Sequence, residues 1–302
     1  MNIIAKRNLF FILSILIILP GLFSIVRWGF KLSIDFTGGS LLELQIAQPK
    51  ETHSSEKIEQ LVEQQGTEVS TIQESGENTY LLRMKPIEDS KARSIEAELE
   101  KSVSSDITIT RFETVGPTIG KELSQKAILA VVVSTLLIVI YIAWAFRTVP
   151  KSVSSWQFGL TAIVALIHDV LVVLGLFSLL GHFYNVEVDT LFITALLTIM
   201  GFSVHDTIVV FDRVRENLKT MGSADFAHVV NESLLQTLAR SLSTSTTVMF
   251  TLFALYLFST GSLRWFVVAL LAGMVSGTFS SLFTAAPFLV LWQDWREKRK
   301  KN

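Results

Sequence analysis

Two acidic residues lie inside long apolar stretches of this sequence, each directly after a histidine. His168-Asp169 interrupts one apolar run, and His205-Asp206 interrupts the next. A charged carboxylate near the centre of a bilayer costs ~2.5–3.5 kcal/mol on insertion scales, so it is kept only where it is paired, protonated or in contact with water. Desolvation also shifts the protonation equilibrium of a carboxyl group, as proton carriers require. Both acids are therefore candidate ion-transfer residues.

A structural role is the alternative for these four residues. A buried carboxylate can accept hydrogen bonds from Ser or Thr of a neighbouring helix without carrying a proton. Adjacent residues on a helix point about 100° apart. We therefore expect His168 and His205 to be packing or hydrogen-bonding residues, with a role as auxiliary relay members as the weaker alternative.

The acids lie in a chain built mostly of membrane-spanning runs. Half of the 302 residues are apolar, and the 53 charged residues are clustered rather than spread evenly. Six runs are long enough to cross ~30 Å of hydrocarbon at 1.5 Å per residue. They cover residues 9–26, 127–146, 158–181, 190–211, 242–261 and 265–291. The first run is longer than the apolar core of a signal peptide and no cleavage site follows it, so we expect an uncleaved anchor.

Basic residues predict how the chain is oriented. They gather before the first run, between the second and third, between the fourth and fifth, and after the sixth, whereas the opposite short loops carry only Arg264. The positive-inside rule then places both termini in the cytoplasm and the long segment 27–126 outside, in a multi-pass protein of the plasma (inner) membrane. On this topology Asp169 lies about 16 Å from the cytoplasmic end of its run and Asp206 about 7–9 Å. Arg240, which opens the fifth run, is a natural charge partner for Asp206.

Segment 27–126 has the pattern of a small α+β domain. Alternating strands are expected at 41–46, 69–73, 79–84 and 107–112, with helices after Ser54 and from Asp89, and a hairpin turn at 75–78. This β-α-β-β-α-β order is that of the ferredoxin-like split motif. The expected fold is thus an all-α bundle of six transmembrane helices with an inserted extracytoplasmic α+β domain.

The sequence predicts that the chain is divided into six parts. They are 1–26 (cytoplasmic N-terminus and first span), 27–126 (extracytoplasmic domain), 127–211 (spans two to four), 212–241 (cytoplasmic loop with an amphipathic helix), 242–291 (spans five and six) and 292–302 (basic cytoplasmic tail). Gly273 and Gly277 in the last span form a small-residue face for close helix packing. The sequence has no cysteine, P-loop or dinucleotide fingerprint, which excludes thiolate metal sites and a nucleotide-binding domain. We expect no metal, no cofactor and no nucleic-acid partner.

Four ordered motifs resemble the SecD/SecF family of Sec protein-export subunits over nearly the whole chain. IDFTGGS at 34–40 contains Asp35, Gly38 and Gly39, and VGPTIG at 115–120 contains Gly116 and Pro117. GFSVHDTIVVFDRVREN at 201–217 is similar to the fourth-span motif of the family. IHD at 167–169, NES at 231–233 and QTLARS at 236–241 resemble the SecF branch, as does the small size of the outer domain.

The resemblance implies a function that hydropathy does not. It implies a non-enzymatic subunit of the RND superfamily that pairs with SecD and associates with the SecYEG channel in the lipid bilayer. It would use the proton-motive force to draw an unfolded preprotein across the membrane after SecA has started it with ATP. By motif position, Asp206 and Arg240 correspond to the charged pair of the family's proton path, and Asp169 is an additional candidate.

Three other functions fit parts of the pattern. Half of an RND-type exporter of lipids or hydrophobic solutes would have similar spans, but such proteins carry larger outer domains. An intramembrane enzyme would use Asp169 and Asp206 as a catalytic dyad, which their different depths make awkward. A pure assembly scaffold would leave both buried acids unexplained. The sequence leaves open whether the coupled ion is H⁺ or Na⁺.

Overall fold

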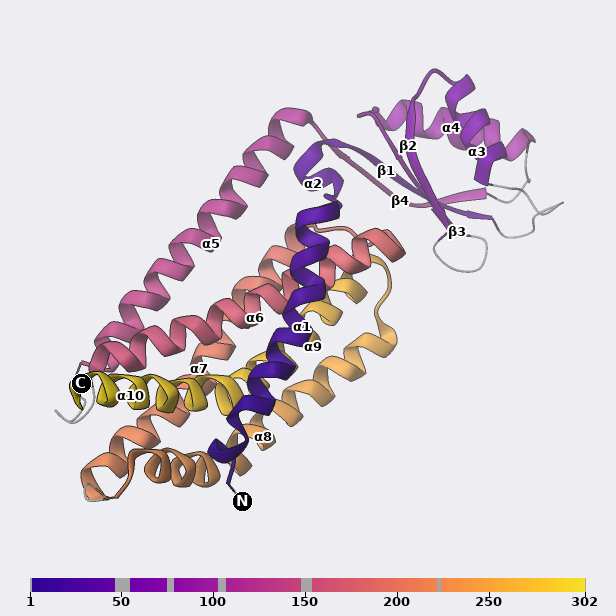
Figure 1. The fold of residues 1–302 in the computed structure, drawn as a ribbon. Helices are drawn as coiled ribbons and strands as arrows, with labels where there is room; N and C mark the ends of the chain where they lie inside the picture. The colour runs from indigo at the N-terminus through magenta and orange to yellow at the C-terminus, as the bar shows by residue number, and fades with distance from the viewer. Residues whose placement is uncertain are drawn as a thin grey trace. The chain divides into compact units, whose positions relative to one another are not determined.

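The computed structural model describes residues 2–46, 55–74, 79–102, 107–147, 154–221 and 224–301, and the chain divides into two compact units (Figure 1). One unit combines Met1–Lys31 with Leu129–Asn302, and the other is Leu32–Ile128. The predicted hairpin turn at 75–78 and the start of the first predicted outer helix at Ser54 lie outside the described residues.

Six helices among the described residues are long and apolar enough to cross a membrane. Their elements are α1 (Arg7–Trp28, preceded by the short η1, Ile4–Lys6), α5 (Pro117–Ala145), α6 (Ser155–Tyr184), α7 (Thr190–Thr220), α8 (Phe226–Phe258), and α9 (Gly261–Ser280) continued by η2 (Ser281–Ala285) and α10 (Ala286–Lys301). Helical hydrogen bonding satisfies the backbone internally, which hydrocarbon requires. The six predicted spans are therefore confirmed as helices.

The bundle is organised around α7 and α9. Helix α7 contacts α6, α8 and α9, helix α9 also contacts α6 and α8, and α1 packs along α6 (Figure 1). Large apolar side chains elsewhere stay exposed, for example Leu16 on α1 and Leu137 on α5. This is the surface expected for lipid contact, because a bilayer does not drive apolar side chains inward as water does.

Helix α8 is longer than the fifth predicted span. The stretch expected to form a separate amphipathic helix is the first part of α8, which runs without a break from Phe226 to Phe258. No glycine or proline occurs in this stretch to interrupt it. Its apolar positions Val229, Val230 and Leu234 are buried inside the protein, and Asn231 accepts a hydrogen bond from the backbone N–H of Ile3 at 2.8 Å.

The last span contains a short π-helical segment. Residues Ser281–Ala285 (η2) widen the helix between α9 and α10, and four of its five residues are buried. Such segments are often found at functional sites and mark places where a helix can change direction. This one begins directly after the serines described below.

The other unit holds a four-stranded antiparallel sheet. Its elements are α2 (Ile34–Thr37), β1 (Gly39–Ile46), α3 (Ser55–Gln64), β2 (Val69–Glu74), β3 (Thr79–Met84), α4 (Asp89–Ser102) and β4 (Ile107–Val115), with strand order β2-β3-β1-β4. Alternate residues of β1 and β3, such as Leu42 and Leu82, form one core with Ile58 of α3 and Ile95 of α4. Both helices therefore contribute to the same apolar core as these strand residues.

Candidate functional site

Asp169 is fully buried at the meeting point of α6, α7 and α9. Its carboxylate accepts hydrogen bonds from Ser203 Oγ at 2.5 Å, Ser276 Oγ at 2.7 Å and Ser280 Oγ at 2.6 Å. His168 Nδ1 lies 3.0 Å from Oδ1. An ionised carboxylate only accepts hydrogen bonds, so four donors from three helices match what this group needs.

Glycine spacing on α9 brings the serines to Asp169. Ser276 and Ser280 are four residues apart and share one face of the helix. Between them, a Cβ on Gly277 would lie 3.2 Å from Ser203 Cβ and 3.7 Å from Asp169 Oδ2. A Cβ on Gly273 would lie 2.4 Å from side-chain atoms of Ile199. Both glycines thus contact α7 closely, which is where the sequence predicted packing.

Asp206 is buried but has few hydrogen-bond partners. Its side chain receives one hydrogen bond from the described residues, from Ser245 Oγ on α8 at 3.4 Å. Thr278 Oγ1 on α9 lies 2.7 Å from the same serine hydroxyl. Asp206 therefore lacks the set of donors that holds Asp169, and its protonation state is less constrained by hydrogen bonding.

Hydroxyl groups of one segment of α9 serve the two acids separately. Ser276 and Ser280 of α9 donate hydrogen bonds to Asp169. Thr278 donates a hydrogen bond to Ser245, which in turn contacts Asp206. No hydrogen bond joins the two carboxyl groups within the described part of the chain. The arrangement offers no shared proton of the kind a catalytic carboxylate dyad uses.

The two histidines differ. The expectation that helical neighbours diverge was too strict for His168, because its ring is long enough to turn Nδ1 back to Asp169. His168 Nε2 is buried and has no hydrogen-bond partner among the described side chains and backbone. His205 is exposed, and its ring lies 6.5 Å from that of Phe202. Of the two histidines, only His168 makes a hydrogen-bond contact with one of the acids among the described residues.

Arg240 is exposed on α8 and forms no ion pair with Asp206 in the described structure. It is five residues before Ser245, the residue that does contact Asp206. The charge pair expected from the sequence is therefore not formed here, although both members lie on adjacent, contacting helices.

A face of α7 and α8 presents polar residues to the outside of the bundle. Its exposed members, called here the polar face, are Thr194, Thr198, Gly201 and His205 on α7, and Arg240, Ser243, Thr244, Thr247 and Thr251 on α8. Several of the threonine hydroxyls bond to carbonyls of their own helix, as Thr198 does to Thr194. His and Arg facing hydrocarbon are costly, so we expect protein to cover this face in the membrane.

The double glycine and the Gly-Pro turn pack against each other. Gly38 has φ +74°, and a Cβ on it would lie 2.8 Å from Pro117 Cα. A Cβ on Gly120 would lie 2.8 Å from Gly38 N, and one on Gly39 (φ +139°) would meet Met84 O at 3.0 Å. Two motifs some 80 residues apart in sequence therefore form one junction where β1 begins and β4 runs into α5. Asp35 lies in α2 beside it, and Gly116 O accepts the hydrogen bond of Gly120 N.

Sequence reasoning missed the hydroxyl partners of the acids. Ser203 and Thr278 had no distinguishing signal, while Ser276 and Ser280 were visible only as small residues beside Gly273 and Gly277 on the predicted packing face. Ser245 lay in a Ser/Thr run that predicts either a polar path or local helix bonding. The described residues contain no cluster of three or more His, Cys, Asp or Glu that could hold a metal ion.

Comparison with known proteins gives one consistent family. A family model described as protein export membrane protein SecD/SecF, C-terminal, matches residues 94–295, and one described as the SecD/SecF GG motif matches residues 23–50. The protein translocase subunit SecF of Anaerolinea thermophila is 43% identical over 305 residues, covering 100% of this chain and 98% of that protein. SecF of Thermobaculum terrenum is 42% identical, covering 97% and 94%.

A solved structure agrees. The crystal structure of SecDF, a translocon-associated membrane protein from Thermus thermophilus, superposes with a TM-score of 0.84 at 32% identity. The match covers 97% of this chain but only 39% of the SecDF chain. The family models, full-length relatives and shared fold together show that this chain belongs to the SecD/SecF family of protein export membrane proteins, in its SecF branch.

Proposed function

We propose that this chain uses the proton-motive force, together with SecD, to promote movement of an unfolded preprotein through SecYEG after SecA has begun the transfer. Family membership supports the export role. Asp206 supports the coupling, because it is a buried acid with a single long hydroxyl contact on the helix that forms half of the polar face. The role requires no catalysed reaction, in keeping with the name of its relatives, translocase subunits.

SecD is the partner proposed for the polar face. In SecDF of Thermus thermophilus a chain segment like this one is 39% of a longer protein. A membrane partner that brings its own polar groups to α7 and α8 would cover His205 and Arg240 and remove them from lipid.

Arg240 is proposed to pair with Asp206 in one state of the transport cycle. The two residues lie on adjacent helices, and α8 already reaches Asp206 through Ser245. A pair that forms when Asp206 is ionised and separates when it is protonated would link ion occupancy to the α7–α8 contact. The same carboxylate chemistry would serve Na⁺, so the driving ion is part of what must be tested.

The topology proposed from the basic residues completes the assignment. Both termini are placed in the cytoplasm and the domain at 27–126 outside. We assign this domain to the ferredoxin-like class, because its βαββαβ order and β2-β3-β1-β4 sheet are those of a split βαβ motif.

Replacing Asp206 tests the proposal. In cells that lack the native copy, Asp206→Asn should abolish the stimulation of preprotein export by the proton gradient, while membrane insertion and level of the subunit stay unchanged. Asp212→Asn is the matched control, because Asp212 is an acid on the same helix that is paired with Arg215 at the exposed end. Gradient-stimulated export that persists in Asp206→Asn would exclude this residue as the coupling site. If a sodium gradient stimulated export by the wild type in place of the proton gradient, the coupled ion would be Na⁺, and Asp206 would remain the proposed coupling site.

A further inference from the structure

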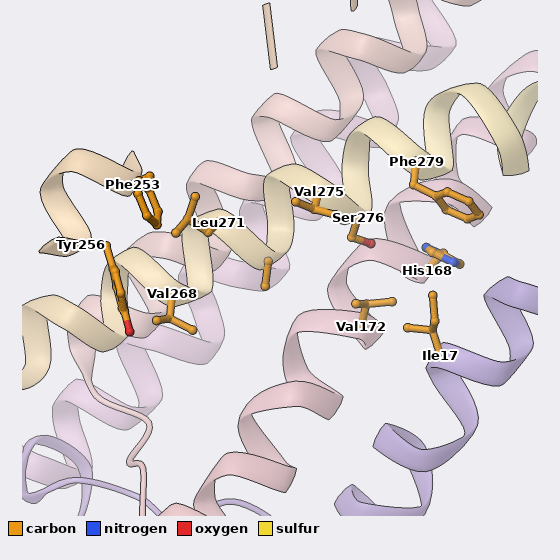
Figure 2. Close-up of a pocket in the computed structure, with 11 residues that line it drawn as sticks. Ile17, His168, Val172, Phe253, Tyr256, Val268, Leu271, Val275, Ser276 and Phe279 are labelled. Atoms are coloured by element: carbon orange, nitrogen blue, oxygen red, sulfur yellow. The ribbon is translucent and has the colours of Figure 1, made fainter. Parts of the chain in front are cut away.

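A lateral groove of about 580 Å³ lies along α9, and two of the residues that contact Asp169, His168 and Ser276, are part of its lining (Figure 2). One face of α9 forms its floor, with residues spaced at i, i+3, i+4, i+7, i+8 and i+11 from Val268 to Phe279. Phe253 and Tyr256 of α8 close one end, and Ile17, His168 and Val172 of α1 and α6 line the other. A cavity of this size and lining is in the range of small-ligand sites.

The groove is apolar except at its two ends. Ser276 lines it but donates its hydroxyl to Asp169, so this hydroxyl is already committed. Tyr256 lies at one end and His168 at the other, with apolar side chains between them (Figure 2). Such a lining selects a hydrocarbon chain as the occupant of the middle.

The length of the groove matches one leaflet of a membrane. Eleven residues separate Val268 from Phe279, which is about 16 Å of helix at 1.5 Å per residue. The hydrocarbon core of a bilayer is ~30 Å thick, so the groove spans about half of it. The Tyr256 end therefore lies where the headgroup of a lipid would be, and the His168 end lies near the midplane.

Arg264 places a positive charge at the Tyr256 end of the groove. Arg264, one turn before Val268, donates a hydrogen bond from Nη2 to the Tyr256 hydroxyl at 2.8 Å, and its guanidinium lies 4.7 Å from the centre of that ring. Arg264 is exposed and forms no ion pair with any residue that the structure describes. Guanidinium groups recognise phosphate well, and basic residues at this depth attract anionic lipids.

We infer that this groove binds one anionic phospholipid, with its phosphate on Arg264 and Tyr256 and one acyl chain lying along α9 as far as His168. The chain end would then cover the imidazole that contacts Asp169, keeping lipid headgroups and water away from that carboxylate. The site is independent of Asp206 and of the proposed coupling, and it can be tested without an export assay.

The test measures lipids retained by the full chain. Protein reconstituted in nanodiscs of equal dioleoyl phosphatidylglycerol and dioleoyl phosphatidylcholine is released into detergent, and native mass spectrometry counts the bound lipids. Wild type should retain one phosphatidylglycerol in preference to phosphatidylcholine. Arg264→Gln should lower this preference on the order of fivefold, the effect of about one basic residue at the interface. Arg147→Gln is the matched control, because Arg147 also stacks on an aromatic ring, at 4.4 Å from Trp144, but lies outside the groove.

Filling the groove tests the acyl chain. Ala272→Trp should abolish retention of either lipid, and Val275→Trp, at the exposed side of the groove, should do the same if the first variant fails to fold. Ala254→Trp on the exposed face of α8 should retain the lipid. Equal retention of both lipids by the wild type, or unchanged retention in both filled variants, would overturn the inference. Displacement of the lipid by soluble glycerol phosphate as effectively as by phosphatidylglycerol would identify a free phosphate site instead.

Discussion

At the scale of single residues, two acids with the same histidine before them have opposite surroundings. Asp169 accepts three hydrogen bonds from serine hydroxyls of α7 and α9 and lies 3.0 Å from His168 Nδ1, whereas Asp206 receives one from the described residues, at 3.4 Å. Removing a carboxylate held by several donors leaves those donors without their acceptor. Asp169 is thus suited to hold three helices together, whereas Asp206 adds little to the contacts between helices.

Removing each carboxyl group should show this division. Asp169→Ala should lower the free energy of unfolding by about 2 kcal/mol, since three interhelical hydrogen bonds are lost at ~0.6 kcal/mol each and buried hydroxyls remain. Asp206→Ala should cost less than about 1 kcal/mol, because one weak contact is lost. Unfolding in mixed detergent micelles, followed by circular dichroism, measures both. An Asp206 variant that is as unstable as the Asp169 variant would contradict the division.

At the scale of elements, glycine positions fix how closely helices approach. Helices α1 and α6 cross at Gly21 and Gly175, where a Cβ on either residue would lie 2.6–2.7 Å from the Cα of the other. Ser24 and Ser178 make a hydrogen bond of 2.7 Å one turn away. The crossing therefore combines backbone contact with a polar anchor, the usual pattern between membrane helices.

A methyl group at this crossing should separate the two helices. Gly175→Ala is expected to destabilise the protein by about 1–3 kcal/mol, the cost of overpacking a close contact. Gly201→Ala is the control: among the described residues, no atom beyond its own helix backbone lies within 4 Å of the added Cβ, and alanine favours a helix by up to ~1 kcal/mol. Thermal unfolding of the two variants should shift in opposite directions. A Gly175→Ala variant as stable as the wild type would show that α1 and α6 can move apart without loss.

The junction of β1 with α5 needs glycine for its positive φ as well as for the close approach of the backbones. Gly38 and Gly29 both have positive φ, at +74° and +70°, but only Gly38 has backbone atoms of another segment against it. Gly29→Ala should cost about 1–3 kcal/mol from its positive-φ backbone conformation alone. Gly38→Ala should cost clearly more, because the Cβ would also meet Pro117. Equal losses of thermal stability in the two variants would remove the contact as the reason for the double-glycine motif.

At the scale of the whole molecule, the described part of the bundle leaves polar residues of α7 and α8 exposed. Thr198, His205 and Arg240 are exposed on α7 and α8, two of the helices that are long and apolar enough to cross a membrane. Exposed apolar residues such as Leu16 on α1 are suited to lipid, whereas the polar face is not. A SecF-branch chain that matches only part of SecDF fits this description, because the remaining part could supply the cover.

A bulky residue on the polar face should weaken association with SecD. Thr198→Trp is expected to reduce the amount of SecD that copurifies with this chain by about tenfold or more, if ~1.4 kcal/mol or more of packing is lost. Leu16→Trp on an exposed apolar surface is the control and should leave the complex intact. If SecD copurifies unchanged with Thr198→Trp, or is lost equally from Thr198→Trp and Leu16→Trp, the polar face is not the SecD contact.

The sequence alone determined what depends on local pattern. Hydrophobic run length predicted the six helices, alternation predicted the strands of the small sheet, and the cost of a carboxylate in hydrocarbon singled out Asp169 and Asp206. The ordered motifs identified the family, which the comparisons confirmed. Periodicity also identified the amphipathic start of α8, but not that it continues directly into the span, because helix ends are weakly encoded.

Only the tertiary structure decided which hydroxyl belongs to which acid. Ser203, Ser276 and Ser280 come from helices far apart in sequence, and they meet at Asp169 because glycines let α7 and α9 approach closely. Contacts of this kind depend on the rotation and depth of each helix, which a hydrophobic run leaves unspecified. The sequence therefore predicted two similar acids, and helix packing made one an anchor between helices and left the other with a single weak contact.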